Sequence, residues 1–584
     1  MTHVGRPSTP ETLAAVGNIA WRFQMQYDLK IRDGFIVDGT GSPGYAGDVG
    51  IRDGRIVALG SAPGEAETVV EANGQVIAPG VVDIHTHYDA QLLWDNKLTI
   101  SPWHGVTTVV IGNCGFGVAP TRREHRGLIL RTLENVEGMS VTSLEAGLGE
   151  DWGFETFPQY LDIVERRGTV INVAALLGHT PLRLSVMGEE ATERAARPEE
   201  VAVMKGIMRE AMEAGALGFA TSKSRTHVGY EGRPVPSRLA EFDEILEIAS
   251  ALGEAGTGVI QATVGKELSF DEFAELNRRT GCNVSWTALL GGGGVLNVGS
   301  VAEQLARSAE LQAAGHAVFP QVSGRPLNFE FRFDQPFLFQ NMPVFAPINK
   351  ADHAGRRALY ADASFREQFR QALRGPRLAS WENAIIAHCS SDPTLDERRL
   401  MDVARERGSN TIDTALDLSL MDDLQARFRV PVANSDEDEV AVLLRDPTTV
   451  VGLSDAGAHA SQLCDACFST HLLGHWVREK NVLTLEEGVR MLTSRPADVF
   501  GIKDRGRLAV GRPADVIVFD RKTINAGPLR RIQDLPGGED RLISEAAGIT
   551  AVIVNGALIR RNGADVLDKD AKLPGRLLRN GSAS

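Results

Sequence analysis

The sequence predicts an α/β fold, in which a (β/α)8 TIM-like barrel is joined to a small β-sandwich built from both chain ends. Two observations predict it. In the middle of the chain, short apolar runs alternate with amphipathic segments at about 30 residues per pair, the size of one βα unit. Strand patterns broken by glycine turns stand at both ends. The periodicity alone leaves an open parallel sheet as the alternative for the middle.

The two ends of the chain show the same pattern of short strands and glycine turns. Residues 27–78 contain alternating polar and apolar runs that meet at Asp-Gly turns, which is typical of β-hairpins. Similar runs return at 514–520 and 549–563. We therefore assign residues 27–80 and 501–584 to the two parts of a β-sandwich, the second with a C-terminal tail. Residues 1–26 form an N-terminal extension.

The middle of the chain, residues 81–500, is assigned to the barrel. Residues 198–214 carry apolar side chains at helical spacing. Pro198 suits the first turn of that helix and Gly215 its end. The strands between such helices are continuously apolar, as expected for a parallel sheet that is buried on both faces.

Further barrel strands and one interruption are expected. The additional strands fall at 172–179, 383–388 and 449–455. An aromatic-rich insert of about 324–380 breaks the alternation of strand and helix. A segment of this kind serves as a lid, as a substrate wall or as a contact between copies of the chain.

Composition narrows the class of function. The chain has 584 residues and a formal net charge of −15, which argues against a nucleic-acid partner. No apolar run approaches the roughly 20 residues that cross a bilayer. Five cysteines in this length are no disulfide framework. We therefore expect a cytoplasmic homo-oligomer that acts on a small molecule, with no membrane or nucleic-acid partner.

The segment VVDIHTHYDAQ, residues 81–91, carries the first functional signal. Side chains two apart in a strand point to the same side, so His85 and His87 can aim at one point. Two imidazoles placed in this way suit a metal ion. The alternative is a strand end with two hydrogen-bonded structural histidines.

Polar side chains follow several other predicted strands. At the carboxyl ends of barrel strands, such groups converge on one mouth. A hydrolytic metal site needs three or four ligands and a proton shuttle, and imidazole and thiolate suit zinc. Asp455 has the setting of the shuttle, because it ends a strand before a glycine-containing turn. The other residues at strand ends are Cys114, His179, Lys223, His227, His388 and His459.

Several motifs resemble the amidohydrolase superfamily over residues 27–140 and 450–560. APGVVDIHTH is similar to its first-strand signature, SDAGAH to its last-strand aspartate, and RGRLAVGRPADVIVFD to its return into the sandwich. HTHYDAQ, GVTTVVIGNCGF and AALLGHTPLR resemble, more closely, the N-acyl-D-amino-acid deacylase (D-aminoacylase) group. The resemblance implies that His85 and His87 bind one metal and Cys114 a second or shared one. It also implies that Asp455 is the catalytic base and a weak metal ligand.

The chain departs from that group at two strands. Typical members carry histidines at the ends of the fifth and sixth strands, and these hold the tighter metal. Here those strands contain Gln261, Thr263, Ser285 and Thr287, which are poor zinc ligands.

Three interpretations follow from this departure. Lys223 could be carbamylated and bridge two metals. One metal could be held by His85, His87 and Asp455, with His179 or His388. The site could also have lost its metal. We favour the second, with a single divalent ion, zinc, in place of two.

The sequence therefore predicts a metal-dependent hydrolase that cleaves a C–N amide bond, in an N-acyl (D-)amino acid or a related amide. The alternatives are a hydantoinase- or dihydropyrimidinase-like hydrolase of cyclic amides and a metal-free barrel with a binding role. We expect several polar side chains to contact the substrate, although a structural or surface role is the alternative for each. These are His179, Arg183, Arg225, His227, Arg325, His388 and His459.

Overall fold

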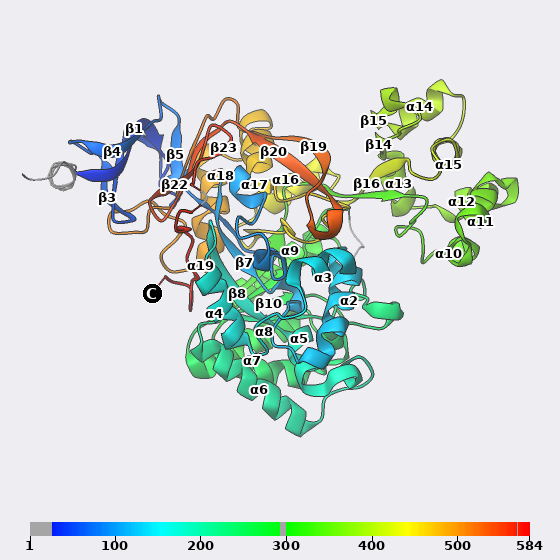
Figure 1. Ribbon diagram of the computed structural model, residues 1–584, viewed down its shortest axis with the longest axis horizontal. Helices are drawn as coiled ribbons and strands as arrows, with labels where there is room; N and C mark the ends of the chain where they lie inside the picture. Colours follow the sequence, from blue (N-terminus) through cyan, green and yellow to red (C-terminus); the bar gives the residue numbers. More distant parts are fainter. Residues whose placement is uncertain (1–25, 293–298, 569, 584) are drawn as a thin grey trace, which may run out of the picture.

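The computed structural model describes residues 26–292, 299–568 and 570–583 (Figure 1). All but the last residue of the expected N-terminal extension lies outside them. Eight parallel strands form the central sheet, in the order β17-β12-β11-β10-β9-β8-β7-β6. An isolated parallel bridge between Thr86 and Ala456 joins the segments that follow the first and last of these strands, so the TIM-like barrel is confirmed. The strands are β6 (Val81–Asp83), β7 (Val106–Ile111), β8 (Asn172–Gly178), β9 (Gly218–Ser222), β10 (Val259–Thr263), β11 (Asn283–Thr287), β12 (Val318–Val322) and β17 (Val450–Val451).

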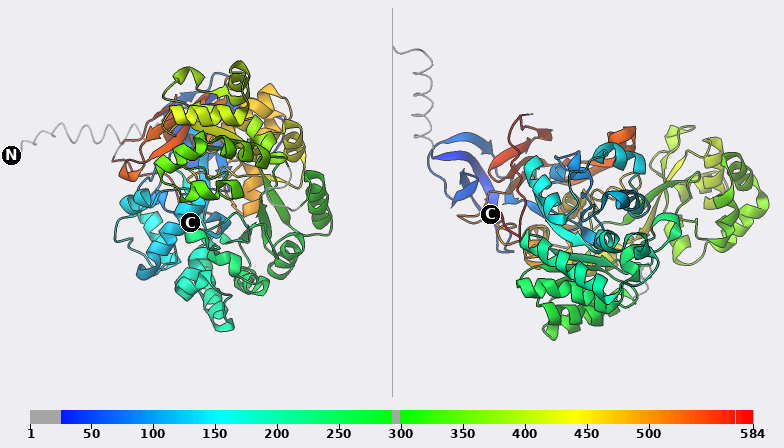
Figure 2. Two further views of the ribbon diagram at one scale, coloured as in Figure 1. Left: turned by 90° about the vertical axis from the view of Figure 1, so that its right-hand side faces the viewer. Right: turned by 60° about the horizontal axis from the view of Figure 1, so that its bottom comes forward.

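Helices cover the outside of this sheet (Figures 1 and 2). Helix α6 (Pro198–Glu213) begins at the proline that the sequence places there. The central strands are buried over their whole length, for example all seven residues of β8, as expected for strands with helices on one side and a filled barrel on the other. Other covering helices are α4 (Phe157–Arg167), α7 (Phe242–Ala255), α8 (Phe270–Thr280) and α9 (Val301–Ala313).

A nine-stranded sheet joins the two ends of the chain. Strand β18 (Val516–Phe519) lies between β5 (Val76–Pro79) and β21 (Ile549–Val554), and it is antiparallel to both. Residues from both ends pack into one hydrophobic core, which includes Ile31 and Ile553. The prediction of a small β domain made from both ends is thus confirmed. Its other strands are β1 (Tyr27–Ile36), β2 (Tyr45–Arg52), β3 (Arg55–Gly60), β4 (Ala66–Glu71), β22 (Ala557–Arg561) and β23 (Ala564–Asp565).

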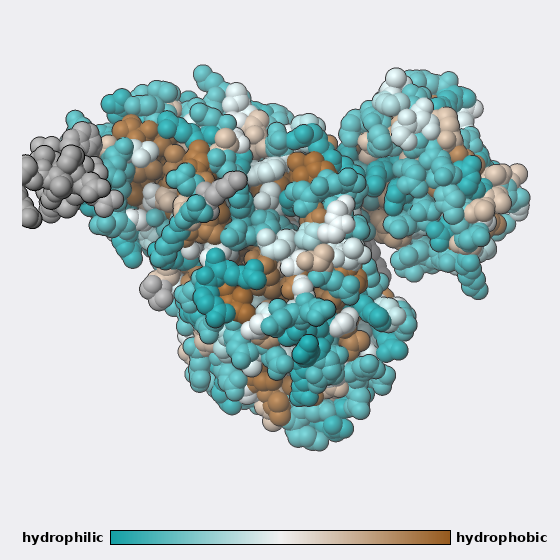
Figure 3. Space-filling view, in the orientation of Figure 1, coloured by the Kyte–Doolittle hydropathy of each residue, from teal (hydrophilic) through white to brown (hydrophobic). Residues whose placement is uncertain are grey.

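Residues 327–433 form a separate body that we call the insert lobe, at the right of Figure 1. It has its own four-stranded sheet, in the order β13-β16-β14-β15, and its own core rich in phenylalanine. On the face drawn in Figure 3 its surface is mainly hydrophilic. The lobe contains β13 (Leu327–Arg332), α10 (Ala346–Lys350), α11 (His353–Ala361), α12 (Ala363–Ala372), α13 (Pro376–Glu382), β14 (Ile385–His388), β15 (Arg398–Arg399), α14 (Leu400–Glu406), α15 (Thr411–Met421) and β16 (Arg427–Ala433).

The expectation of a barrel strand at 383–388 is wrong. Strand β14 covers that segment but pairs antiparallel with β16 inside the insert lobe, with Ile385 opposite Arg429. The barrel takes β12 and β17 as its seventh and eighth strands. No described helix combines the length and the apolar character that crossing a membrane requires.

Candidate metal centre

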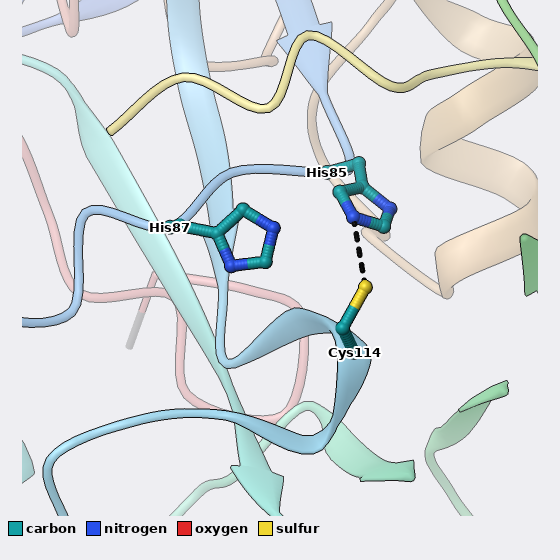
Figure 4. A group of neighbouring side chains, drawn as sticks. All are labelled: His85, His87 and Cys114. Carbon is teal, nitrogen blue, oxygen red and sulfur yellow. Dashed lines mark hydrogen bonds between the residues drawn. The ribbon is translucent and has the colours of Figure 1, made fainter. Parts of the chain in front are cut away.

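His85 and His87 follow β6 on an extended segment that points both rings to one side (Figure 4). Thr86, between them, is fixed toward the next strand, because both its amide and its hydroxyl donate to the carbonyl of Val110. The two rings are buried, and their centroids lie 5.3 Å apart. The strand-end geometry predicted from the HxH spacing is therefore present.

Cys114 reaches the same point from a tight turn after β7. Its own φ is 54°, and Gly112 and Gly115 beside it have φ of 85° and 75°. A side chain at Gly112 would place a Cβ 2.2 Å from the carbonyl oxygen of Leu176, so the turn requires glycine there. The Cys114 Sγ lies 3.4 Å from His85 Nε2. The ligand atoms of His85, His87 and Cys114 all lie within 4.8 Å of one another.

Asp455 comes to this group from the loop after β17. Its Oδ1 lies 3.3 Å from His85 Nε2 and 3.7 Å from His87 Nε2. Burial would raise the pKa of Asp455, but the hydrogen bond from His87 and the charges of both imidazoles hold it well below its usual range. The carboxylate is therefore ionised at neutral pH and directed at the nitrogens that would bind an ion.

Glu137 is a member of this group that the sequence did not reveal. It is the last residue of α2 (Arg126–Glu137), and its Oε1 lies 3.2 Å from His87 Nδ1. Both side chains are buried. A carboxylate on the second ring nitrogen of a metal-binding histidine fixes the orientation of the ring. No local pattern marks Glu137, because only the fold brings the end of α2 to the barrel mouth.

The donor atoms fit a divalent transition metal. Two imidazole nitrogens, a thiol and a carboxylate are the groups that bind zinc in proteins. Burial would raise the pKa of Cys114, but the charges and hydrogen bonds of His85 and His87 bring it to about 6. The thiol is thus ready to lose its proton, as a metal ligand must.

His227 and His459 border the group. The His227 ring packs edge-on against Phe116, with centroids 5.1 Å apart, and its Nδ1 lies 2.7 Å from Ser222 Oγ. Burial, and then the nearby charges of His87 and His459, lower its pKa to about 3, so the ring is neutral. His459 packs edge-on against Phe329 of the insert lobe. Its buried Nδ1 has no hydrogen-bond partner among the described residues.

We call His85, His87, Cys114, Asp455 and Glu137 the metal group, and Lys223 does not join it. Its ammonium donates to the backbone carbonyls of Arg238 and Ala240. A carbamate would instead turn a negative charge toward these carbonyl oxygens. The bridging role that the sequence suggested is therefore not supported by this geometry.

Three of the side chains expected to contact substrate bind other groups of the protein instead. His179 and Arg183 are fully buried and both bind the carboxylate of Glu244. His388 lies on β14 of the insert lobe, where its ring binds Asp396 at 2.9 Å and is half exposed. The structure does not bring these residues to the metal group.

The two other arginines expected to contact substrate are Arg325 and Arg225. Arg325 Nε donates to Asp465 Oδ1 at 2.8 Å, in a pair that is nearly buried. The guanidinium is therefore neutralised inside the protein instead of standing ready for a substrate carboxylate. Arg225 is exposed on the loop before His227.

The ends of β10 and β11 confirm the departure noted in the sequence. Gln261, Thr263, Ser285 and Thr287 are buried there. Gln261 Nε2 donates to Thr287 Oγ1 at 3.3 Å, Thr287 Oγ1 donates to Thr263 Oγ1, and Ser285 Oγ accepts from Gln321. These strands offer amides and hydroxyls in place of the histidines that the resemblance to the deacylase group implies.

Comparisons with known proteins agree with this geometry. A family model described as the amidohydrolase family matches residues 68–560. An uncharacterized protein of Mycobacterium tuberculosis is 30% identical over 596 residues, which cover 93% of this chain and 94% of that protein. The N-acyl-D-glutamate deacylase of Alcaligenes xylosoxydans xylosoxydans is 30% identical over 563 residues, which cover 95% and 97%.

A solved structure has a similar fold over most of the chain. It is an N-acyl-D-glutamate deacylase from Bordetella bronchiseptica in complex with zinc and a phosphonate inhibitor. The TM-score is 0.62 at 27% identity, and the match covers 95% of this chain and 99% of that one. The chain belongs to the amidohydrolase family and is similar, over nearly its full length, to the N-acyl-D-amino-acid deacylases.

Proposed function

We propose that the protein is a metal-dependent amidohydrolase that cleaves the amide bond of an N-acyl (D-)amino acid or a related amide. The observation that carries the proposal is the convergence of His85, His87 and Cys114 within 4.8 Å, with Asp455 Oδ1 3.3 Å from His85 Nε2. The similarity to an N-acyl-D-glutamate deacylase at 30% identity supports the choice of bond.

His85, His87 and Cys114 would hold one divalent ion, with Asp455 as a fourth, weaker ligand. We propose zinc, because the donor set suits it and a similar deacylase structure contains it. One ion is favoured over two, because the fifth- and sixth-strand positions hold Gln261 and Ser285. The ion would supply Lewis acidity, which polarises a carbonyl and lowers the pKa of water.

The residues of the chain would move the protons. Asp455 is ionised, and we assign it the proton of the attacking water, which it then delivers to the departing nitrogen. Glu137 would hold the His87 ring in place from its second nitrogen. His459, whose buried Nδ1 finds no hydrogen-bond partner in the described part of the chain, is the candidate that binds the oxygen of the substrate as negative charge develops on it.

The test combines metal analysis with a substrate screen. Purified protein should hold about one transition-metal ion per chain. The screen compares N-acyl-D-amino acids, N-acyl-L-amino acids and cyclic amides. Turnover of the acyclic D series supports the proposal. Turnover of cyclic amides alone would move the assignment to the hydantoinase-like alternative. Protein that binds no metal and cleaves no amide would favour a binding barrel.

Oligomeric state and cellular location stay predictions. We expect a cytoplasmic homo-oligomer, and gel filtration coupled to light scattering measures its mass. The roles given to His227 and Arg225 in contacting substrate also stay predictions. His227 borders the metal group, and Arg225 lies two residues before it, which supports these roles.

A further inference from the structure

A buried glutamine faces the ring of His85. His85 Nδ1 lies 2.8 Å from Gln321 Oε1, and Gln321 Nε2 donates to Ser285 Oγ at 3.1 Å. Both His85 and Gln321 are almost fully buried, so water does not compete for these bonds. The other ring nitrogen of His85, Nε2, points at Cys114 and Asp455. An ion on Nε2 requires the proton to sit on Nδ1, which then donates to the Gln321 oxygen.

A second glutamine holds the turn of Cys114. The backbone N–H of Cys114 donates to Gln261 Oε1 at 2.6 Å, and Gln261 Nε2 donates to Thr287 Oγ1. Cys114 has a left-handed φ of 54°, a conformation that is unfavourable for a residue with a side chain. The hydrogen bond that Cys114 N–H donates to Gln261 therefore stabilises the backbone conformation that turns Sγ toward His85.

We infer that Gln321 and Gln261 are positioning residues of the metal group: Gln321 fixes the tautomer and orientation of His85, and Gln261 fixes the turn that presents Cys114. This inference rests on the proposed metal site, and it adds to it the role of the fifth and seventh strands. The side-chain amides of Gln261 and Gln321, on these two strands, hold Cys114 and His85 in position to bind one ion.

The inference depends on both amides being placed by the sheet. Gln261 lies in β10 and Gln321 in β12, and β11 is the strand between these two. Gln261 Nε2 donates to Thr287 of β11, and Gln321 Nε2 donates to Ser285 of β11. Each amide is thus held at one end by β11 and contacts a ligand residue at the other. An apolar side chain of the same length keeps the packing but loses both bonds.

The experiment measures cobalt(II) binding to metal-free protein, without any substrate. The visible absorption of cobalt(II) reports coordination, and a near-ultraviolet band reports the thiolate of Cys114. The variants are Gln321→Met, Gln321→Glu and Gln261→Met. Gln304→Met is the matched control, because Gln304 is a buried amide on α9 that donates to a backbone carbonyl away from the ligands. Circular dichroism of each metal-free variant checks that it is folded.

Gln321→Met is expected to weaken cobalt(II) binding about 10–100-fold, the usual effect of removing a group that orients a ligand. Gln321→Glu keeps the acceptor oxygen and is expected to bind cobalt(II) at least as tightly as the wild type. Gln261→Met should weaken binding and reduce the thiolate band. Gln304→Met should leave both unchanged.

Equal affinity of Gln321→Met, Gln261→Met and wild-type protein would overturn the inference, and so would wild-type protein that binds no cobalt(II). Wild-type protein that binds cobalt(II) as expected but hydrolyses no amide would refute the proposed function alone. Loss of binding in Gln321→Met with recovery in Gln321→Glu would support the inference whatever the substrate.

Discussion

The metal group combines acidic side chains with two imidazole rings. Cys114, Asp455 and Glu137 lie against the rings of His85 and His87 in a largely buried space. Burial raises the pKa of Glu137, so this carboxyl competes for a proton in spite of His87 beside it. A divalent cation at the Nε2 atoms of the two rings would supply positive charge beside Cys114 and Asp455, with Glu137 on the far side of the His87 ring.

Asp455→Asn tests the proton carrier. The amide keeps the shape of the side chain but cannot accept a proton, so kcat/KM for amide hydrolysis should fall about 10²–10⁴-fold. Metal content, measured by mass spectrometry, should stay near one ion per chain, because the histidines and Cys114 remain. Asp396→Asn, which changes a carboxylate of the insert lobe, is the control and should keep full activity. Unchanged kcat/KM in Asp455→Asn would exclude it as the base.

Glu137→Gln tests the carboxylate behind His87. Loss of the carboxyl group beside Nδ1 should weaken metal binding about 10–100-fold, because an amide holds the ring less firmly and makes it less basic. Competition with a chelator measures the affinity. Glu134→Gln, one turn earlier on α2 and exposed, provides the control. Equal metal affinity in both variants would show that Glu137 does not support the site.

The sequence could reveal some of these residues and not others, for a physical reason. His85 and His87 are two apart in an extended segment, so local geometry alone places them together. Glu137 and Gln321 lie at the end of a helix and inside a strand, and only the closed barrel brings them to the two histidines. A residue that acts through tertiary contact leaves no signal in a short stretch of sequence.

At the scale of elements, the third and fourth strands are braced by a buried polar cluster. His179, at the start of α5 (His179–Met187), binds Thr221 of β9 through Nδ1 and Glu244 of α7 through Nε2. Arg183, one turn along α5, pairs with the same carboxylate. The cluster connects two helices and a strand, which explains why two residues expected to bind substrate lie in the interior.

Glu244→Gln should destabilise the protein by about 3–5 kcal/mol at pH 7, because it leaves the Arg183 charge buried without its partner. Urea unfolding measures the difference from wild type, and Glu241→Gln, exposed at the start of α7, is the control. Burial would raise the pKa of Glu244, but His179 and Arg183 lower it to about 2, below the usual 4.5.

The pH dependence of that difference follows from the direction of the shift. A carboxyl whose pKa is lowered by folding contributes its full stability above the unfolded pKa and loses it as pH falls through the folded value. The gap between wild type and Glu244→Gln should therefore be constant above pH 4.5 and narrow from there toward pH 2. A gap that widened on acidification would contradict the ion pair.

Element types were predictable, whereas the sheet to which an element belongs was not. The run Asn383–His388 is apolar and ends in histidine, as a barrel strand would, yet it pairs inside the insert lobe. Strand β14 packs on the core of the lobe through Ile386, whereas a barrel strand is buried over its whole length, but both environments favour a short apolar run. The boundaries of the insert could not be found for the same reason, because its strands and helices resemble those of the barrel.

At the scale of the whole molecule, three bodies share one chain: the barrel, the nine-stranded sheet and the insert lobe (Figure 2). The lobe leaves and re-enters through β13 and β16, whose ends are paired, Leu327 opposite Ala433. It also contacts the site, since Phe329 packs on His459 and Glu330 pairs with Arg531 of the C-terminal hairpin β19 (Asn525–Gln533) and β20 (Asp540–Ala547). The lobe is thus separate in its core and joined at the mouth.

Replacement of residues 328–432 by a short Asn-Gly turn tests this separation. The paired ends can be joined without moving them, so the barrel should fold and keep its metal content. Amide hydrolysis should fall, because His459 loses the ring it packs against. Metal analysis, circular dichroism and a hydrolysis assay measure the three effects. Loss of the metal together with the lobe would show that the lobe is required for the site itself.

The nine-stranded sheet contains strands from both ends of the chain, so it can be completed only late in synthesis. Strands β1 to β5 leave the ribosome first, yet β18, which covers the side of β5, is translated only after the entire barrel. Until then the nascent chain carries an unpaired strand edge, the kind of surface that invites wrong partners. Translation of β18, and not emergence of the first strands, is therefore the moment at which this sheet can close.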